Sequence, residues 1–235
     1  MLSEAVKAKP ETLDRHILSA ENRDVRGLYP HNLYVRYGKR AFDAAGALLI
    51  ALMLLPLLCL VACLVRMQGR GVIFGHERVG QNGQRFRCLK FRTMVPDAET
   101  RLRELLERDP AARLEWEEHH KLDNDPRITR MGQILRRTSL DELPQLWNVM
   151  RGDMSLVGPR PVTPTELTER YGEMAGAYQT VRPGVTGAWQ VSGRNDLSYD
   201  QRVRLDRDYA RDHSFAGDLS ILIRTVKVVV APNGK

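Results

Sequence analysis

The chain has 235 residues, of which 43% are hydrophobic, enough for a folded core; this excludes an intrinsically disordered chain and a disulfide-stapled mini-protein. The formal net charge of +7 favours an anionic partner, which can be nucleic acid, a phospholipid surface or a phosphorylated small molecule. The three cysteines form no disulfide or zinc-binding pattern and are interpreted as reduced structural thiols: Cys59, Cys63 and Cys88.

The N-terminal region is predicted to be a polar leader, residues 1–35, followed by a membrane element, residues 36–70. The stretch from Ala44 to Val65 (AAGALLIALMLLPLLCLVACLV) carries no charge, and as a straight helix it would be about 33 Å long. Asp43, at its start, is either an ion-pair partner of the neighbouring basic residues or a solvent-exposed carboxylate.

Two features favour a re-entrant helical hairpin over a single crossing of the membrane. Basic residues flank both ends of the apolar stretch, and the positive-inside rule then places both ends in the cytoplasm. Pro56 removes a helical hydrogen bond about halfway along and predicts a kink or break there. The alternative is a proline-kinked transmembrane helix.

The remaining residues, 71–235, are predicted to form a compact cytoplasmic domain, so the whole chain is α+β and mostly helical. The segment VIFGHERVGQNGQRFRCLKFRTM indicates a short β-hairpin. A charged helix is expected from about Asp97, interrupted at Asp109–Pro110. Capping patterns predict further helix starts at TPTE and SYDQ. The end, DLSILIRTVKVVV, is either an amphipathic helix at the lipid headgroups or a core-packed helix.

An acidic pair, Asp141 and Glu142, stands in TSLDELPQLWN, before an apolar helical run. Ser139 and Glu142 match a capping box, which gives a purely structural explanation of the glutamate. Carboxylates near a helix N-terminus also suit nucleophilic phosphoryl chemistry, provided that cations offset the repulsion between anions. Candidate cations recur in KFRTM, LRRTS and VGPRP.

An ordered set of motifs resembles the bacterial sugar transferase family, the monotopic polyprenyl-phosphate phosphoglycosyltransferases. The motifs are KRAFD, the proline-broken apolar segment, KFRTM, SLDELPQLWNVMRGDMSLVGPRP, VRPGVTGAWQVSGRND and RLDRDYA, and they extend from about Lys39 to Val230. The length resembles that of short exopolysaccharide-initiating members. One departure is Ala188 in TGAWQ, where relatives often carry a larger apolar residue.

The resemblance implies transfer of a sugar 1-phosphate from a UDP-sugar to undecaprenyl phosphate at the inner membrane, with release of UMP. It implies that Asp141 is the nucleophile, forms a covalent phosphosugar and binds Mg²⁺, and that Glu142 assists. It implies that six basic residues contact phosphate or nucleotide: Lys90, Arg92, Arg136, Arg160, Arg182 and Arg194. It also implies that Asp206 is a further polar residue of the site.

Other interpretations stay open at this point. A membrane-tethered module that binds anionic lipid without catalysis is the main alternative, and a nucleic-acid partner is not expected because no motif supports one. The sequence does not select the sugar, although the resemblance favours galactose or glucose. It does not fix the oligomeric state either, and a homodimer is left open.

Overall fold

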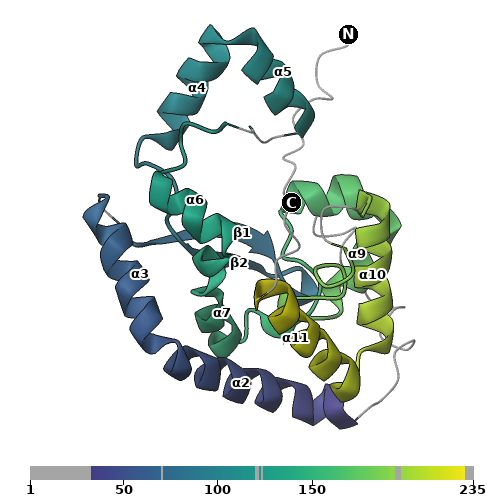
Figure 1. The fold of residues 1–235 in the computed structure, drawn as a ribbon. Helices are drawn as coiled ribbons and strands as arrows, with labels where there is room; N and C mark the ends of the chain where they lie inside the picture. The colour runs from purple at the N-terminus through teal and green to yellow at the C-terminus, as the bar shows by residue number, and fades with distance from the viewer. Residues whose placement is uncertain (1–32, 70, 120–121, 123, 194–196, 231–235) are drawn as a thin grey trace, which may run out of the picture. The chain divides into compact units, whose positions relative to one another are not determined.

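The computed structural model describes residues 33–69, 71–119, 122, 124–193 and 197–230, so nearly all of the predicted leader lies outside the described residues. These residues are mostly helical, with two small two-stranded sheets, which confirms the α+β prediction (Figure 1). The chain divides into two units. Of the described residues, those within 33–48, 77–88 and 146–230 belong to the first unit, and those within 49–76 and 89–145 belong to the second.

The apolar segment forms two helices, α2 (Lys39–Met53) and α3 (Leu55–Met67), after a short π-helix, η2 (Tyr34–Gly38). The axis bends by 68° at the break, next to Pro56, which confirms the predicted interruption. In the part of the chain that the structure describes, no single helix has the length and apolar composition needed to cross a membrane. The bent pair meets that test only when its two helices are taken together.

The β-hairpin is confirmed: β1 (Ile73–Val79) and β2 (Arg85–Phe91) pair across a turn that contains η3 (Gln81–Gly83). Asn82, at φ 58°, takes the left-handed conformation that asparagine tolerates better than most residues. The first unit contains the turn end of the hairpin, and the second contains the end that carries Lys90.

The second unit is built around α3, β2 and α6 (Arg130–Arg137). Val61 and Val65 of α3 pack against Phe91 and Leu135. A charged helical pair, α4 (Ala98–Arg108) and α5 (Pro110–His119), is interrupted at Asp109–Pro110 as predicted; its two helices contact each other. The unit ends in a 3-10 turn, η4 (Leu140–Glu142).

The first unit has its apolar core around Val79, Val162, Tyr171, Tyr178 and Val203. Its remaining elements are α7 (Gln145–Arg151), β3 (Ser155–Val157), α8 (Pro164–Glu166), η5 (Leu167–Tyr171), η6 (Gly172–Met174), α9 (Ala175–Gln179), β4 (Gly184–Thr186), α10 (Tyr199–Asp212) and α11 (Phe215–Val230). Capping boxes start α8 and α10, as TPTE and SYDQ predict.

Strands β3 and β4 are parallel, with Ser155 opposite Gly184 and Val157 opposite Thr186. A side chain at Gly184 would place its Cβ 2.1 Å from the backbone nitrogen of Gly158, so only glycine allows the two strands to approach this closely.

Helix α11 contacts β3 and β4 on one side and exposes Phe215, Leu219, Ile223 and Val226 on the other. The core-packed interpretation therefore describes one face of α11, and the interfacial interpretation stays a prediction for the other face.

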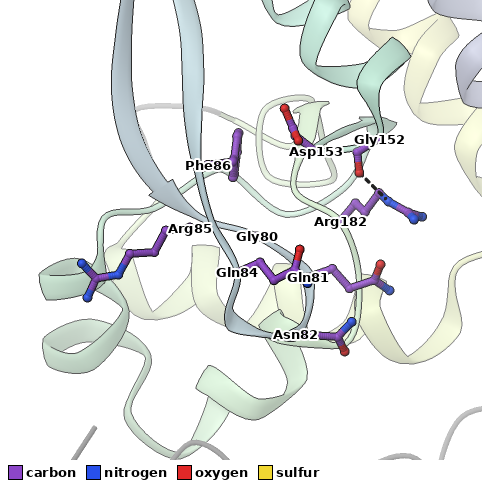
Figure 2. Close-up of a pocket in the computed structure, with 9 residues that line it drawn as sticks. All are labelled: Gly80, Gln81, Asn82, Gln84, Arg85, Phe86, Gly152, Asp153 and Arg182. Atoms are coloured by element: carbon purple, nitrogen blue, oxygen red, sulfur yellow. Dashed lines mark hydrogen bonds between the residues drawn. The ribbon is translucent and has the colours of Figure 1, made fainter. Parts of the chain in front are cut away.

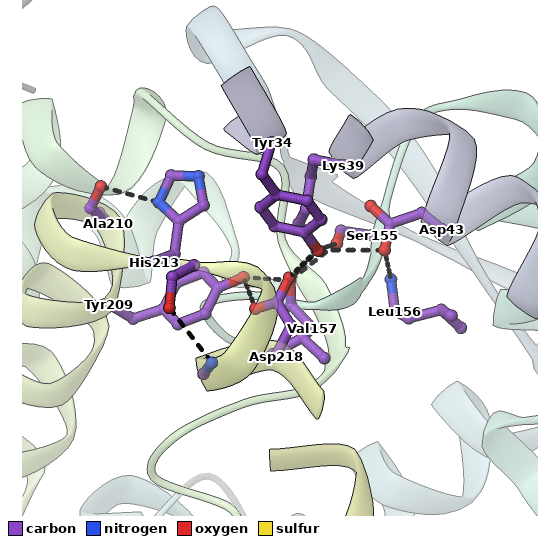
Figure 3. Close-up of polar contacts among 12 residues, drawn as sticks. Tyr34, Lys39, Asp43, Ser155, Leu156, Val157, Tyr209, Ala210, His213 and Asp218 are labelled. Carbon is purple, nitrogen blue, oxygen red and sulfur yellow. Dashed lines mark hydrogen bonds and ion pairs between the residues drawn. The ribbon is translucent and has the colours of Figure 1, made fainter. Parts of the chain in front are cut away.

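A buried charge cluster fixes the start of α2 (Figure 3). Lys39 Nζ lies 3.1 Å from Asp43 Oδ1 and 2.9 Å from Asp218 Oδ2, and it donates to the Ser155 hydroxyl. Asp43 also accepts from the Leu156 backbone N–H at 3.1 Å. Asp43 is therefore an ion-pair partner, as one interpretation predicted, and the exposed alternative is wrong because this carboxylate is buried.

Candidate active site

The acidic pair lies in η4, between α6 and α7 in the chain. Ser139 precedes η4 in the left-handed conformation, at φ 58°, and its side chain makes no capping bond. The predicted Ser139–Glu142 capping box is therefore wrong, because its first residue lacks the extended backbone that a helix N-cap requires. Leu143 is helical despite preceding Pro144, and the regular helix begins only at Gln145.

The two carboxylates share one ammonium group. Lys90 Nζ lies 2.5 Å from Glu142 Oε1 and 3.9 Å from Asp141 Oδ2. Asp141 is 7% exposed, whereas Glu142 remains accessible to solvent. Leu140 and Leu143 pack against the apolar cluster around Leu135 and so hold the turn between them in place.

Burial raises the pKa of Asp141, and the neighbouring Glu142 raises it further. The positive charges of Lys90 and Arg136 lower the pKa of Asp141 and oppose this effect. The carboxylate is thus poorly hydrated but held beside cations. This environment suits a nucleophile, because few water molecules have to be displaced before it reacts.

The two other predicted cations of the second unit, Arg136 and Arg92, have different surroundings. Arg136 Nε donates to Thr93 Oγ1 at 2.9 Å, and its charge acts on Asp141. The guanidinium of Arg92 lies over Gly71, where a Cβ would come within 2.8 Å of Nη2. The structure therefore brings Lys90 and Arg136 to the acidic pair and places Arg92 against the loop that leads into β1.

In the first unit, Arg160 and Asp206 line one cavity of about 10 Å³, together with Val162, Glu166, Tyr171, Trp189, Tyr199 and Arg202. Asp206 is 1% exposed and accepts from the Tyr171 hydroxyl at 2.8 Å. Burial raises its pKa to about 7, against the opposing effects of the Tyr171 hydroxyl and the Arg160 backbone. Asp206 therefore supports the loop around Arg160 from within the core.

Arg182 caps the end of α7 together with Arg40. Arg40 donates to the carbonyl oxygens of Val149 and Met150, and Arg182 Nε donates to Gly152 O at 2.8 Å. Cations that bind the last carbonyls of a helix also favour its dipole, so this arginine has a structural contact. It lies in the wall of a second cavity, shown in Figure 2. Arg194 lies outside the described residues.

Sequence reasoning missed Thr93 and Trp189. Thr93 belongs to KFRTM, but a threonine carries no charge that would mark it as a phosphate contact. The guanidinium carbon of Arg160 lies 5.6 Å from the centre of the Trp189 ring, and the guanidinium carbon of Arg202 lies 4.9 Å from it. Trp189 Nε1 and Arg202 Nε find no hydrogen-bond partner among the described residues. The sequence signal that could have identified Trp189 is its position in TGAWQVSG, between two glycines.

The donor set near Asp141 fits magnesium only in part. No group of three or more histidine, cysteine, aspartate or glutamate side chains that could hold a metal ion occurs among the residues that the structure describes. Magnesium is commonly held by one or two carboxylates with substrate phosphates completing its shell, and Asp141 and Glu142 already share a cation in Lys90. The pair therefore fits a metal that arrives with a phosphorylated substrate.

The chain is similar to several known proteins over most of its length. A sequence model of a protein family described as bacterial sugar transferase matches residues 34–232. The UDP-galactose-lipid carrier transferase of Erwinia amylovora is 54% identical over 199 residues, which are 85% of this chain and 42% of that protein. The undecaprenyl-phosphate galactose phosphotransferase of Salmonella typhimurium is 49% identical over 199 residues, with the same coverage.

A shorter relative matches along most of its length. The exopolysaccharide production protein ExoY of Sinorhizobium fredii is 49% identical over 197 residues, which are 83% of this chain and 87% of that protein. The chain thus spans less than half the length of the first two relatives and most of the third.

Proposed function

The chain belongs to the bacterial sugar transferase family, and from that premise we propose that it moves a hexose 1-phosphate from a UDP-hexose to undecaprenyl phosphate. UMP is the leaving group, and the product is an undecaprenyl-diphosphate hexose, the first lipid-linked intermediate of an exopolysaccharide. The names of the first two relatives support galactose as the hexose, and a relative from Komagataeibacter xylinus, an undecaprenyl-phosphate glucose phosphotransferase that is 40% identical over 202 residues, supports glucose.

The single observation that carries the proposal is the shared cation of the acidic pair, Lys90 between Asp141 and Glu142. In the first step, an Asp141 carboxylate oxygen attacks the phosphorus that bears the sugar. The bond from that phosphorus to the bridging oxygen breaks, and UMP leaves with the electron pair. In the second step, an oxygen of undecaprenyl phosphate attacks the same phosphorus and Asp141 is released.

The neighbouring groups have separate tasks in this mechanism. Lys90 and Arg136 keep Asp141 ionised and offset the charge of the incoming diphosphate. Glu142, which is more exposed than Asp141, orients or deprotonates the acceptor phosphate. Asp141, with Glu142 beside it, would hold a magnesium ion, which supplies further charge neutralisation to the transferring phosphoryl group when bound.

The bent pair α2–α3 supports a location at the inner membrane. Its exposed side chains include Leu48, Leu52, Met53, Leu55 and Leu60, which water would solvate poorly. We propose that the pair enters one leaflet and returns, so that both of its ends and the catalytic residues lie on the cytoplasmic side. A soluble nucleotide sugar and a lipid phosphate can meet at that depth.

Purified protein incubated with UDP-[¹⁴C]galactose or UDP-[¹⁴C]glucose and undecaprenyl phosphate tests the proposal. UMP release and a radiolabelled lipid, both dependent on magnesium, are the expected result. Asp141→Asn should lose both, and Asp208→Asn, at a partly exposed aspartate of α10, serves as the matched control. Retention of lipid without UMP release would instead favour a non-catalytic lipid-binding module.

A further inference from the structure

The larger cavity of the first unit, about 240 Å³, lies at the turn of the β-hairpin and has no part in the mechanism above (Figure 2). Two guanidinium groups, from Arg85 and Arg182, and one carboxylate, from Asp153, line it together with side-chain amides of the turn. The lining therefore carries more positive than negative charge. Which ligand it favours depends on which of these charges already have a partner.

Two of the three charged groups have partners of opposite charge. Arg85 Nη1 lies 3.0 Å from Glu77 Oε1. Asp153 Oδ2 lies 3.4 Å from Arg151 Nε, and it also accepts from Asn148 Nδ2 at 3.0 Å. The carboxylate in the wall is thus occupied by donors of its own, which reduces its repulsion of a second anion.

Arg182 is the charged group without such a partner. Among the described residues it has no ion pair, and its Nε donates to the carbonyl oxygen of Gly152 at 2.8 Å. Its two terminal nitrogens donate to no residue in the described part of the chain and are open to solvent. The guanidinium of Arg40 lies over the same glycine, where a Cβ would come within 3.5 Å of Arg40 Cζ. Two positive charges therefore meet at Gly152.

The carbonyl oxygens at the end of α7 offset these two charges only in part. Arg40 donates to Val149 O and Met150 O, but a carbonyl carries a partial charge and a guanidinium a full one. Burial lowers the pKa of Arg182, the charge of Arg40 lowers it further, and Asp43 raises it. Asp43 already belongs to the buried cluster at the start of α2. The arginine pair is left with an excess of positive charge that a bound anion would offset.

We propose that this cavity binds a phosphate group through the terminal nitrogens of Arg182, with Arg40 adding its charge from behind Gly152. The planar fork of a guanidinium matches two phosphate oxygens at once. A phosphate has further oxygens, which can accept from the side-chain amides of Asn82 and Gln84 in the lining. The volume is below the usual range for drug-sized ligands and suits one small group with ordered water.

The phosphate group can come from two sources, a phospholipid headgroup or a water-soluble phosphate. Arg40 precedes the apolar stretch that begins at Ala44, a position that suits a headgroup. The exposed side chains of Asn82 and Gln84 suit a ligand that arrives from water. Neither source requires the proposed transferase reaction.

Arginine modification by phenylglyoxal, measured for each residue by peptide mass spectrometry, tests the site in the full-length protein in detergent. We expect sodium phosphate to slow the modification of Arg182 by about three- to tenfold as its concentration rises above the Kd, relative to sodium chloride at equal ionic strength. Arg204, an exposed arginine of α10, should react equally in both salts. Equal rates for Arg182 in both salts would overturn the proposal.

The Lys90→Ala protein separates this cavity from the acidic pair. It should show the same protection of Arg182 by phosphate. Loss of the protection in that variant would overturn the proposal, because the anion would then be bound beside Asp141 and Glu142. The measurement needs no turnover, so a failure of the transferase reaction leaves its result intact.

Calorimetric titration of phosphate into variants in the Lys90→Ala background measures the contribution of each arginine. Arg182→Gln should bind phosphate about tenfold more weakly, and Arg182→Lys, which keeps the charge but loses the fork, about threefold more weakly. Arg204→Gln should bind as the parent does. Equal affinity in Arg182→Gln and Arg204→Gln would contradict the proposal, and the protection measurement still tests it if Arg182→Gln does not fold.

Nanodiscs in phosphate-free buffer identify the source of the phosphate group. Protection of Arg182 in phosphatidylglycerol nanodiscs, but not in phosphatidylcholine nanodiscs, would assign the site to an anionic headgroup. Protection that requires added free phosphate in both would assign it to a water-soluble phosphate. Absence of protection under all of these conditions would overturn the proposal.

Discussion

Lys90 has two roles: its charge keeps Asp141 ionised, and its ammonium group is a partner of Glu142. Because Lys90 lowers the pKa of Asp141, Lys90→Ala should raise that pKa. The acidic limb of kcat/KM against pH should then move to higher pH, and the plateau should fall by about 100-fold. Arg85→Ala, a cation of the same strand, should leave the limb in place; a shift of equal size there would show that Lys90 has no specific effect.

Asp206 makes stability depend on pH, because burial raises its pKa to about 7. A carboxyl group with a raised pKa in the folded state stabilises the fold fully below its unfolded pKa, about 3.9, and this contribution is lost as pH rises through about 7. Thermal unfolding midpoints should therefore decline over this range.

Two variants check the Asp206 assignment by thermal unfolding. Asp206→Asn should remove most of the decline, since the amide does not titrate. Tyr171→Phe removes a bond that favours the ionised form, so the decline should extend to higher pH. An unchanged pH dependence in Asp206→Asn would assign the decline to another group.

Individual residues of the candidate site could be predicted where the chemistry requires a particular residue type at a particular position of a motif. The acidic pair alone fitted a helix start as well as a catalytic site, and the ordered motifs around Asp141 and Glu142 led to the prediction that they act chemically. The capping box failed because the left-handed backbone of Ser139 depends on tertiary packing of Leu140 and Leu143, which no local pattern records. Arg182 and Asp206 were predicted as polar site residues, and the contacts that the structure gives them depend on residues distant in sequence.

At the scale of elements, the start of α2 depends on one buried cation. Lys39 lies between Asp43 and Asp218, and the hydroxyls of Tyr34 and Tyr209 also donate to Asp218. Lys39→Met would leave both carboxylates buried without a counter-charge. We expect a loss of about 3–5 kcal/mol in the free energy of unfolding.

Chemical denaturation in detergent measures that loss, with Arg36→Ala as the control, since Arg36 is exposed and its guanidinium lies over the ring of Tyr37. A loss below about 1 kcal/mol for Lys39→Met, a value typical of surface pairs, would mean that the cluster does not anchor the helix.

Most elements followed from local chemistry. The glycine- and asparagine-rich turn predicted the hairpin, the capping boxes predicted α8 and α10, and Asp109–Pro110 predicted the break between α4 and α5. The parallel pairing of β3 with β4 was not predictable. Each strand has three residues, and their pairing depends on the close approach of Gly158 and Gly184 from separate parts of the chain.

At the scale of the whole molecule, the proposal requires both ends of the bent pair to be cytoplasmic. Cysteines introduced one at a time at Arg36 and at Gln68 test this with a membrane-impermeant maleimide, in a protein whose exposed Cys59 and Cys63 are changed to alanine and whose buried Cys88 is retained. We expect both sites to react only after the inner membrane is broken, because basic flanks stay in the cytoplasm. Reaction of one flank from the periplasmic side of intact spheroplasts would establish a transmembrane crossing.

The central claim is the ester between Asp141 and the phosphorus of a phosphosugar. Protein mixed with UDP-hexose in the absence of lipid acceptor, quenched with acid and digested, can be examined by peptide mass spectrometry. The account predicts a hexose-phosphate addition on the peptide that contains Asp141, removed when undecaprenyl phosphate is added before the quench. A modification on another side chain, or none while the lipid product still forms, would contradict it.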